Sequence, residues 1–361
     1  MIHLLYVINF LDHGGPSNVL KNLVFSLDQK KYHITILTLV NENRLEVIQD
    51  FEKQNIKIIS LNYNKNLKSI LRNRALITKK INSFGADIVH SHGIVPTFLV
   101  ANKKIKAKKI ATIHNIMHED YRYTYGTLKG AVFTKAHLKA LRHYNKIVCC
   151  SESSYNALKT KLKNCTFIRN GVNPATPNKN SRTTIRKKLN LKPTDIIYIY
   201  SGNISKLKGS LELTKLFEKY HKTNEYLLLI GNHQLDQKLT NKHIIFIGQK
   251  QNIIDYLSAS DVYVSNSHTE GFSISIIEAL SSGLPLFLRN IPSHQECFNI
   301  DKSYYLGETF TPETFPQKLS TLRKNFPTIN HDKIRQFQKT HLSAKVMAKK
   351  YDNLYEKEVK C

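Results

Sequence analysis

Short apolar runs alternate with longer amphipathic runs along this chain, and the alternation occurs twice. In the first half, the apolar runs predict strands at Ile2–Ile8, Tyr32–Leu39, Ile56–Leu61, Asp87–His90, Lys109–Ile113, Lys146–Cys150 and Thr166–Ile168. The helical patterns between them include Ser17–Leu27, Leu67–Phe84 and Gly130–His143. Strands that alternate with helices form parallel sheets covered on both faces, so the first half is predicted to be a doubly wound α/β domain.

The second alternation follows Asn170–Ser181, a stretch rich in asparagine and proline that is typical of a linker. Its strands are expected at Asp195–Ser201, Tyr226–Ile230, His243–Ile247, Asp261–Ser265 and Leu284–Leu288. A polar amphipathic helix is expected at His341–Lys360. Since 361 residues exceed one typical core, we expect two Rossmann-like domains facing a cleft, at 1–172 and 173–340, and a C-terminal helix at 341–361 that packs on the first domain.

The composition is that of a globular protein, with 41% hydrophobic and 22% charged residues. No apolar run approaches the roughly 18 residues of a membrane span. The start, Met1–Phe10, lacks a basic leader and a cleavage site and reads as a first strand. The five cysteines are odd in number and show no ligand spacing, which favours a reducing, cytoplasmic location.

Positive charge is the second distinctive property, because 54 Lys and Arg residues against 27 Asp and Glu residues give a formal net charge of +27. Such an excess favours a polyanionic partner: nucleic acid, anionic lipid or a pyrophosphate-linked substrate. Lysines crowd the stretch from Lys103 to Lys163. Apolar helical residues stand among them, namely Leu128, Val132, Phe133, Leu138 and Leu141. They suit either docking on an anionic membrane or the buried face of a core helix.

Glu270 and Glu278 stand in a strand–loop–helix segment, on either side of the turn Gly271-Phe272-Ser273. The expected helix begins at this turn, and a helix N-terminus presents unpaired N–H groups that can hold a phosphate. The glycine break lets both carboxylates line one cleft, where they could accept hydrogen bonds from sugar hydroxyls. The alternative is an N-capping glutamate followed by a solvated one.

The Gly14-Gly15 pair follows the first predicted strand and precedes a helix expected to begin near Pro16, with Ser17 as its cap. Open α/β sheets bind ligands at this edge, and glycines let the backbone approach them closely. The pair could equally make only a turn.

Three histidines, His90, His92 and His114, end the fourth and fifth predicted strands. No carboxylate or cysteine joins them at ligand spacing, so a metal site is not expected. Structural roles fit His90 and His92.

Together these motifs resemble the retaining glycosyltransferases of the GT-B fold, family four (group 1), as in bacterial surface-polysaccharide biosynthesis. The resemblance spans nearly the whole chain. It implies that Glu270 and Glu278 form the family's Glu-x7-Glu pair and that Gly14-Gly15 belongs to the acceptor-side domain. It also implies that His114 contacts the donor sugar.

The segment Ser201-Gly-Asn-Ile-Ser-Lys-Leu-Lys-Gly209 resembles the family loop whose arginine and lysine neutralise the diphosphate. Lys208 matches the lysine, whereas Asn203 stands where the arginine is expected. Either Lys206 or Arg289 could compensate. The loops at Gly231-Asn232 and Gly248-Gln-Lys250 fall where the family contacts the nucleotide base.

The resemblance therefore implies transfer of a hexose from a nucleotide-diphosphate sugar to an acceptor hydroxyl, with retention, in polysaccharide, O-antigen (lipopolysaccharide) or capsule assembly. No cofactor or metal is expected, since the chain has no Asp-x-Asp motif and basic groups can replace a cation. The implied catalytic residues are Lys208, Glu270 and His114. The implied substrate-binding residues are Gly14, Gly15, Asn203, Lys206, Gly271, Phe272, Ser273 and Glu278.

The expected partners are a nucleotide-sugar donor and a glycan or lipid-linked glycan acceptor, without nucleic acid. The expected location is the cytoplasm, with peripheral binding to the inner face of its membrane. Three alternatives stay open: a catalytically impaired sugar-nucleotide-binding protein, a basic nucleic-acid-binding protein, and a GT-B relative such as a sugar-nucleotide epimerase.

Overall fold

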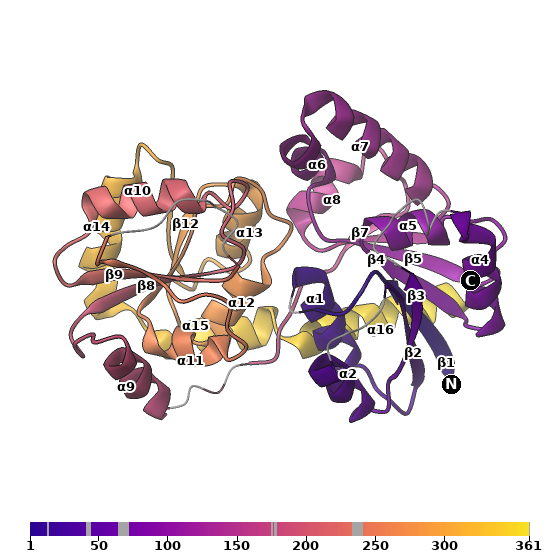
Figure 1. Ribbon diagram of the computed structural model, residues 1–361, viewed down its shortest axis with the longest axis horizontal. Helices are drawn as coiled ribbons and strands as arrows, with labels where there is room; N and C mark the ends of the chain where they lie inside the picture. The colour runs from indigo at the N-terminus through magenta and orange to yellow at the C-terminus, as the bar shows by residue number, and fades with distance from the viewer. Residues whose placement is uncertain are drawn as a thin grey trace. The chain divides into compact units, whose positions relative to one another are not determined.

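The computed structural model describes residues 1–12, 14–40, 45–63, 72–174, 176, 179–232 and 241–360 (Figure 1). The chain divides into unit 1, Met1–Gly171 with Ala344–Cys361, and unit 2, Val172–Ser343. In each unit, helices cover both faces of a parallel sheet, as the alternating pattern predicts. The first residues of the helix expected at Leu67–Phe84 lie outside the described residues.

The described part of unit 1 contains a seven-stranded parallel sheet in the order β3-β2-β1-β4-β5-β6-β7. Its strands are β1 (Ile2–Ile8), β2 (Tyr32–Val40), β3 (Lys57–Tyr63), β4 (Ile88–His92), β5 (Lys108–Ile113), β6 (Lys146–Cys149) and β7 (Cys165–Phe167). Its helices are α1 (Gly15–Val24), α2 (Leu45–Glu52), α4 (Arg74–Ser83), α5 (Ile94–Val100), α6 (Met117–Tyr125), α7 (Thr127–Leu141), α8 (Glu152–Leu158) and α16 (Ala344–Lys360). Leu4 to Val7 of β1 are fully buried, because helices cover both faces of this central strand.

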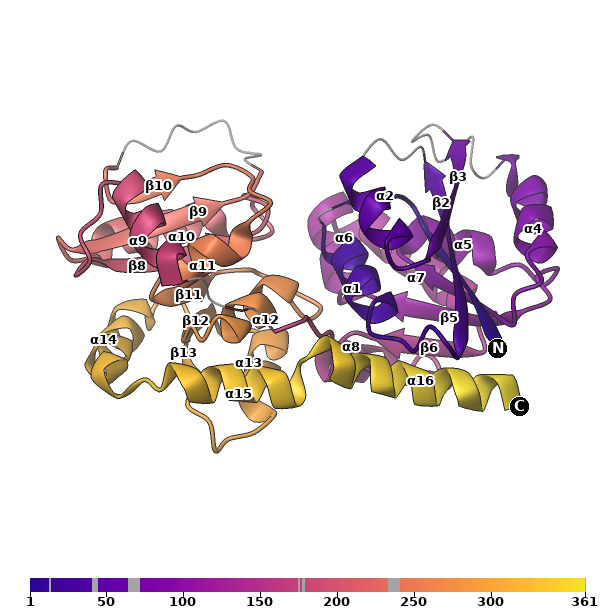
Figure 2. The ribbon, with the colours of Figure 1, turned by 90° about the horizontal axis from the view of Figure 1, so that it is seen from below.

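The C-terminal helix α16 packs on unit 1, as expected (Figure 2). Its Tyr355 hydroxyl lies 2.9 Å from the Tyr6 hydroxyl of β1 and 2.8 Å from Nδ1 of His90 on β4. Lys31 Nζ forms ion pairs with Asp352 and, at 2.6 Å, with Glu356. A buried hydroxyl–imidazole network and a surface ion-pair cluster therefore hold this helix. It begins at Ala344, three residues after the end of a separate helix, and not at the expected residue 341.

The described part of unit 2 contains a six-stranded parallel sheet in the order β10-β9-β8-β11-β12-β13. Its strands are β8 (Ile196–Ser201), β9 (Glu225–Ile230), β10 (Ile244–Phe246), β11 (Val262–Ser265), β12 (Leu286–Arg289) and β13 (Gly307–Phe310). Its helices are α9 (Lys179–Lys188), α10 (Ser210–Tyr220), α11 (Ile253–Ala259), α12 (Ile274–Ser281), α13 (Pro292–Asn299), α14 (Phe315–Asn325), the 3-10 turn η1 (Phe326–Thr328) and α15 (His331–His341). Strand β12 begins two residues later than predicted, because Gly283 takes a left-handed turn (φ 82°) and Pro285 has no N–H to give to the sheet.

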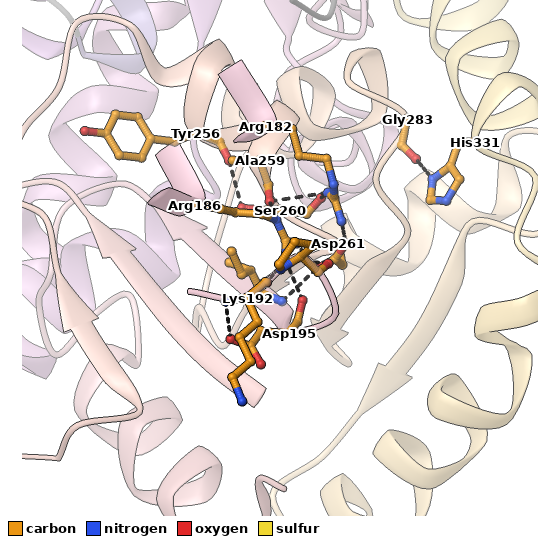
Figure 3. A network of polar contacts seen from close by, with 12 residues as sticks. Arg182, Arg186, Lys192, Asp195, Tyr256, Ala259, Ser260, Asp261, Gly283 and His331 are labelled. Atoms are coloured by element: carbon orange, nitrogen blue, oxygen red, sulfur yellow. Dashed lines mark hydrogen bonds and ion pairs between the residues drawn. The ribbon is translucent and has the colours of Figure 1, made fainter. Parts of the chain in front are cut away.

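Asp261, just before β11, ties α9 to the sheet of unit 2 (Figure 3). Its two carboxylate oxygens each lie 2.6 Å from a guanidinium nitrogen, one of Arg182 and one of Arg186. Asp261 also accepts a hydrogen bond from the backbone N–H of Ile197 at 2.8 Å. Arg186 is buried and donates further to the backbone carbonyls of Ala259 and Asp195. This network lies at the amino ends of β8 and β11. It therefore fixes the sheet at the edge opposite the carboxyl ends of the strands.

Each sheet changes its direction of winding next to its first strand, between β1 and β4 in unit 1 and between β8 and β11 in unit 2. In open α/β sheets such a switch point leaves a crevice at the carboxyl ends of the strands, where ligands bind. The loops that follow these strands carry the predicted site residues.

Candidate active site

An ion pair joins the loops after β8 and β11 at the switch point of unit 2. Lys208 Nζ lies 2.6 Å from Oε1 of Glu270, and the Ser267 hydroxyl donates to the same oxygen at 2.9 Å. Burial alone would raise the pKa of Glu270, but the nearby Lys208 ammonium outweighs it, and the net shift is downward. The pair is therefore an ionised carboxylate against a charged amine, both partly buried.

Gly209 allows the two loops to meet. It adopts a left-handed conformation (φ 58°), and a Cβ atom there would lie 2.1 Å from the carbonyl oxygen of Asn266. The Asn266 amide in turn donates to the Gly209 carbonyl at 3.1 Å. Any side chain at this position would push the loops apart, so glycine here keeps Lys208 next to Glu270 and starts α10.

Glu278 lies in the second turn of α12, whose N-cap is Ser273. Burial raises the pKa of Glu278 to about 7. Within the part of the chain that the structure describes, its carboxyl group has no hydrogen-bond or ion-pair partner. Burial raises the pKa of the Tyr263 phenol on β11, and both Glu270 and Glu278 raise it further, because both carboxyl groups lie near the Tyr263 hydroxyl.

The other predicted residues of unit 2 differ in exposure. The Phe272 ring and Gly271 are buried, so this turn can offer a ligand its backbone but not the phenyl ring. Asn203 and Lys206 are exposed in the loop after β8, where Asn203 accepts a hydrogen bond from the Tyr200 hydroxyl at 2.9 Å through its carbonyl.

Two further side chains lie beside this loop: Arg289, which the sequence offered as a substitute for the missing arginine, and His294, which was not singled out from the sequence. Arg289, at the end of β12, donates from Nη1 to Glu212 Oε2 at 2.7 Å and to Asn266 Oδ1 at 3.3 Å. His294 of α13 is buried, with Nδ1 2.8 Å from the Arg289 carbonyl oxygen. Burial lowers the pKa of His294 to about 4, so its ring is neutral at neutral pH. The strand–loop–helix pattern from Leu286 to Asn299, which repeats that of β11 and α12, was the available signal for His294.

In unit 1, His114 follows β5, and its Nε2 lies 3.1 Å from Nδ1 of the buried His92 at the end of β4. Burial lowers the pKa of His114 to about 4, so it is a neutral hydrogen-bonding group. His90 is buried with both ring nitrogens near hydroxyls, those of Tyr355 and Thr112, as a structural histidine requires. The described residues contain no cluster of three or more histidine, cysteine or acidic side chains arranged to hold a metal ion.

Gly14 and Gly15 lie at the carboxyl end of β1, where Gly14 is the N-cap of α1. The expected cap, Ser17, is wrong: its buried hydroxyl donates to the Phe10 carbonyl at 3.3 Å and accepts from the backbone N–H of Asp12 at 3.1 Å. It therefore closes the loop before the helix, and the first turn of α1 has no side-chain cap.

Two parallel α/β units, with ligand-binding switch points at their strand ends, are the architecture of the GT-B glycosyltransferases. Residues 13–176 match the model of Glycosyltransferase Family 4, and residues 181–339 match that of Glycosyl transferases group 1. The chain belongs to this family of transferases.

Known proteins similar to the chain include the O-antigen biosynthesis glycosyltransferase WclY of Escherichia coli, 27% identical over 97% of each chain. The capsular polysaccharide biosynthesis glycosyltransferase CapH of Staphylococcus aureus is 24% identical over 90% of each. Among solved structures, Anabaena Alr3699/HepE in complex with UDP superposes with a TM-score of 0.79 at 12% identity, covering 99% of this chain and 100% of that one. In the described residues, no helix is both long and apolar enough to cross a bilayer.

Proposed function

We propose that this transferase moves a hexose from a nucleoside diphosphate sugar to a hydroxyl group of a glycan acceptor, with retention of anomeric configuration, in the assembly of a surface polysaccharide such as an O-antigen or capsule. The observation that carries the proposal is the Lys208–Glu270 ion pair at the switch point of unit 2. The names of WclY and CapH support the polysaccharide role, and HepE has been solved with UDP-glucose as well as with UDP.

In this proposal Lys208 neutralises the diphosphate as it leaves the sugar, because a fixed cation stabilises developing negative charge in a water-poor site. Glu270, released from Lys208, accepts a hydrogen bond from a sugar hydroxyl, and Glu278 accepts one from the ribose. The turn Gly271–Ser273 brings the N-terminus of α12 to the phosphates.

Asn203 and Lys206 complete the donor loop in this proposal. We assign His114 to the donor sugar and Gly14-Gly15 to the acceptor, following the family resemblance. His114 is neutral, so it would donate or accept a hydrogen bond without adding charge.

A second candidate is a protein that binds a sugar nucleotide without turning it over. Asn203, a neutral side chain where the family has an arginine, motivates it. Single-turnover measurements with a saturating donor separate the two, since binding without sugar transfer would identify the impaired protein.

We also propose that the protein binds peripherally to an anionic membrane, where a lipid-linked glycan acceptor would lie. Leu128 and Val132 on α7 are 85% and 67% exposed, and Lys135 and Lys139 continue the same helical stripe. By contrast Leu141 is fully buried, so the core-helix alternative holds for that residue. We call the exposed residues Arg122, Tyr123, Tyr125, Leu128, Lys129, Val132, Phe133, Lys135 and Lys139 the α6–α7 surface.

The donor assignment is tested by thermal shift with UDP-, GDP-, ADP- and dTDP-sugars, because a ligand that binds only the folded protein raises its melting temperature. With the donor so identified, Lys208→Ala and Glu278→Ala should each lower turnover at least about tenfold while the protein stays folded. Lys215→Met, on the exposed face of α10, removes one positive charge away from the loop and should leave turnover unchanged. Near-wild-type turnover of both site variants would refute this site.

A further inference from the structure

A diphosphate carries more than one negative charge, whereas only one of the two lysines in the loop after β8, Lys208, is held in an ion pair among the described residues. Asn203 in the same loop is neutral, and Lys206 is exposed, with no hydrogen-bond or ion-pair partner for its amine among the described residues. A site that releases a diphosphate without a second held cation would leave charge uncompensated in a partly buried place.

Arg289 supplies a second positive charge at the same sheet edge. It stands one residue beyond Leu288, which pairs with Ser265, the last residue of β11, so its side chain leaves the sheet where the Glu270 loop begins. The guanidinium group is partly buried and held by Glu212 and Asn266. Asn266 also bonds the carbonyl of Gly209, the residue next to Lys208. Two hydrogen bonds thus link the guanidinium group of Arg289 to the backbone beside the lysine.

The buried ring of His294 gives a second indication that these charges share one site. Besides burial, the carboxylate of Glu270 raises its pKa, while the charges of Lys208 and Arg289 lower it. All three charged groups therefore lie close enough to act on one imidazole. Nε2 of His294 is buried without a hydrogen-bond partner among the described residues.

We propose that Arg289 is the second diphosphate-binding cation of this enzyme, and that Glu212 holds the guanidinium group in position until the nucleotide arrives. A guanidinium group suits this role, since its planar fork binds phosphate oxygens in pairs. The inference rests on the proposed function, because it assumes that a diphosphate enters beside Lys208. The competing explanation is that Arg289 only neutralises Glu212.

The test measures the affinity of purified full-length variants for the nucleoside diphosphate, among UDP, GDP, ADP and dTDP, that stabilises the wild type most, and for the matching nucleoside. Arg289→Met should lower the affinity for the nucleoside diphosphate at least about tenfold, because a charged hydrogen-bond donor is lost. It should leave the affinity for the nucleoside unchanged. Lys215→Met is the matched loss of one charge, and circular dichroism checks that each variant is folded. The double variant Arg289→Met with Glu212→Gln then separates the two explanations.

If Arg289 binds the diphosphate, the double variant stays as weak as Arg289→Met. Recovery of wild-type affinity in the double variant would instead mean that Arg289 serves only Glu212, and unchanged affinity of Arg289→Met would also overturn the inference. If the wild type binds none of the four nucleotides, the result contradicts the proposed function itself. If the wild type binds one of them and Arg289→Met binds it equally well, only the role of Arg289 is contradicted.

Discussion

Glu278 is a partly buried residue whose carboxyl group changes its charge near neutral pH. Burial raises its pKa to about 7 in the folded protein, from 4.5 for an unperturbed glutamate. At a pH between these two pKa values, the Glu278 carboxyl group is protonated in the folded state and ionised in the unfolded state. The free energy of unfolding therefore falls as the pH rises through this window, and the contribution of Glu278 is fully present only below about pH 4.5.

We predict that Glu278→Gln, which keeps the shape but cannot ionise, reduces the loss of thermal stability between about pH 5 and pH 8. Melting temperatures of wild type and variant across this range measure it. The exposed Glu52 of α2 provides the control, because Glu52→Gln should leave the pH dependence as it is in the wild type. Parallel pH profiles for wild type and Glu278→Gln would mean that the buried carboxyl group titrates normally.

Single-residue roles could be predicted from the sequence only where a local pattern carries them. The strand–loop–helix context of Glu270 and the glycine next to Lys208 are local, so both residues could be proposed from the sequence. Their ion pair joins positions 62 apart in the chain, and the contact of Arg289 with Glu212 joins positions 77 apart. Such pairs depend on which strands lie next to each other in the sheet. The spacing of residues along the chain does not determine that order.

The helices and strands themselves were largely predictable, because each depends on the spacing of apolar residues within its own short segment. The predicted bounds of β1, Ile2–Ile8, match those of the structure. Strand β13 was missed, since Gly307–Phe310 is a short edge strand with little apolar content. Helix α7 begins at Thr127 and not at Gly130, and its apolar residues divide between exposed Leu128 and buried Leu141. The sequence alone could not tell which face of α7 is buried, because apolar residues stand on both the buried and the exposed face.

The attachment of α9 to the unit 2 sheet can be tested by replacing, one at a time, the two arginines that share the Asp261 carboxylate. Arg182 and Arg186 both lie 2.6 Å from Asp261, but their side chains are 43% and 4% exposed. Breaking a buried ion pair leaves an uncompensated charge and costs about 3 kcal/mol or more, whereas an exposed pair contributes at most about 1 kcal/mol. We predict that Arg186→Met lowers the melting temperature of the unit by several degrees more than Arg182→Met does. Calorimetry measures the difference, and equal shifts would contradict the role of burial.

For the whole enzyme, we predict that sugar transfer does not require a divalent metal. The chain has no Asp-x-Asp motif, and in our proposals Lys208, Arg289 and the N-termini of α10 and α12 together carry the countercharge of the diphosphate. Turnover should therefore survive exhaustive EDTA treatment. Loss of turnover that manganese or magnesium restores would show that a cation is needed at the phosphates.

The net charge of +27 and the α6–α7 surface together predict where the whole molecule binds. Each lysine near an anionic bilayer contributes about 1 kcal/mol, and salt weakens the attraction, whereas apolar side chains that enter the interface add a part that salt does not screen. The protein should therefore sediment with phosphatidylglycerol vesicles at low salt, less at about 0.5 M salt, and weakly with phosphatidylcholine vesicles.

Replacing Leu128 and Val132 by serine should reduce the binding that remains at high salt, because it removes the two most exposed apolar residues of this surface without changing any charge. Leu76→Ser is the matched control, since Leu76 is 62% exposed on α4, outside the α6–α7 surface. If Leu76→Ser weakens sedimentation as much as the double variant does, binding does not depend on the α6–α7 surface. If the wild type sediments equally and negligibly with both kinds of vesicle, the basic charge of the chain does not serve membrane attachment.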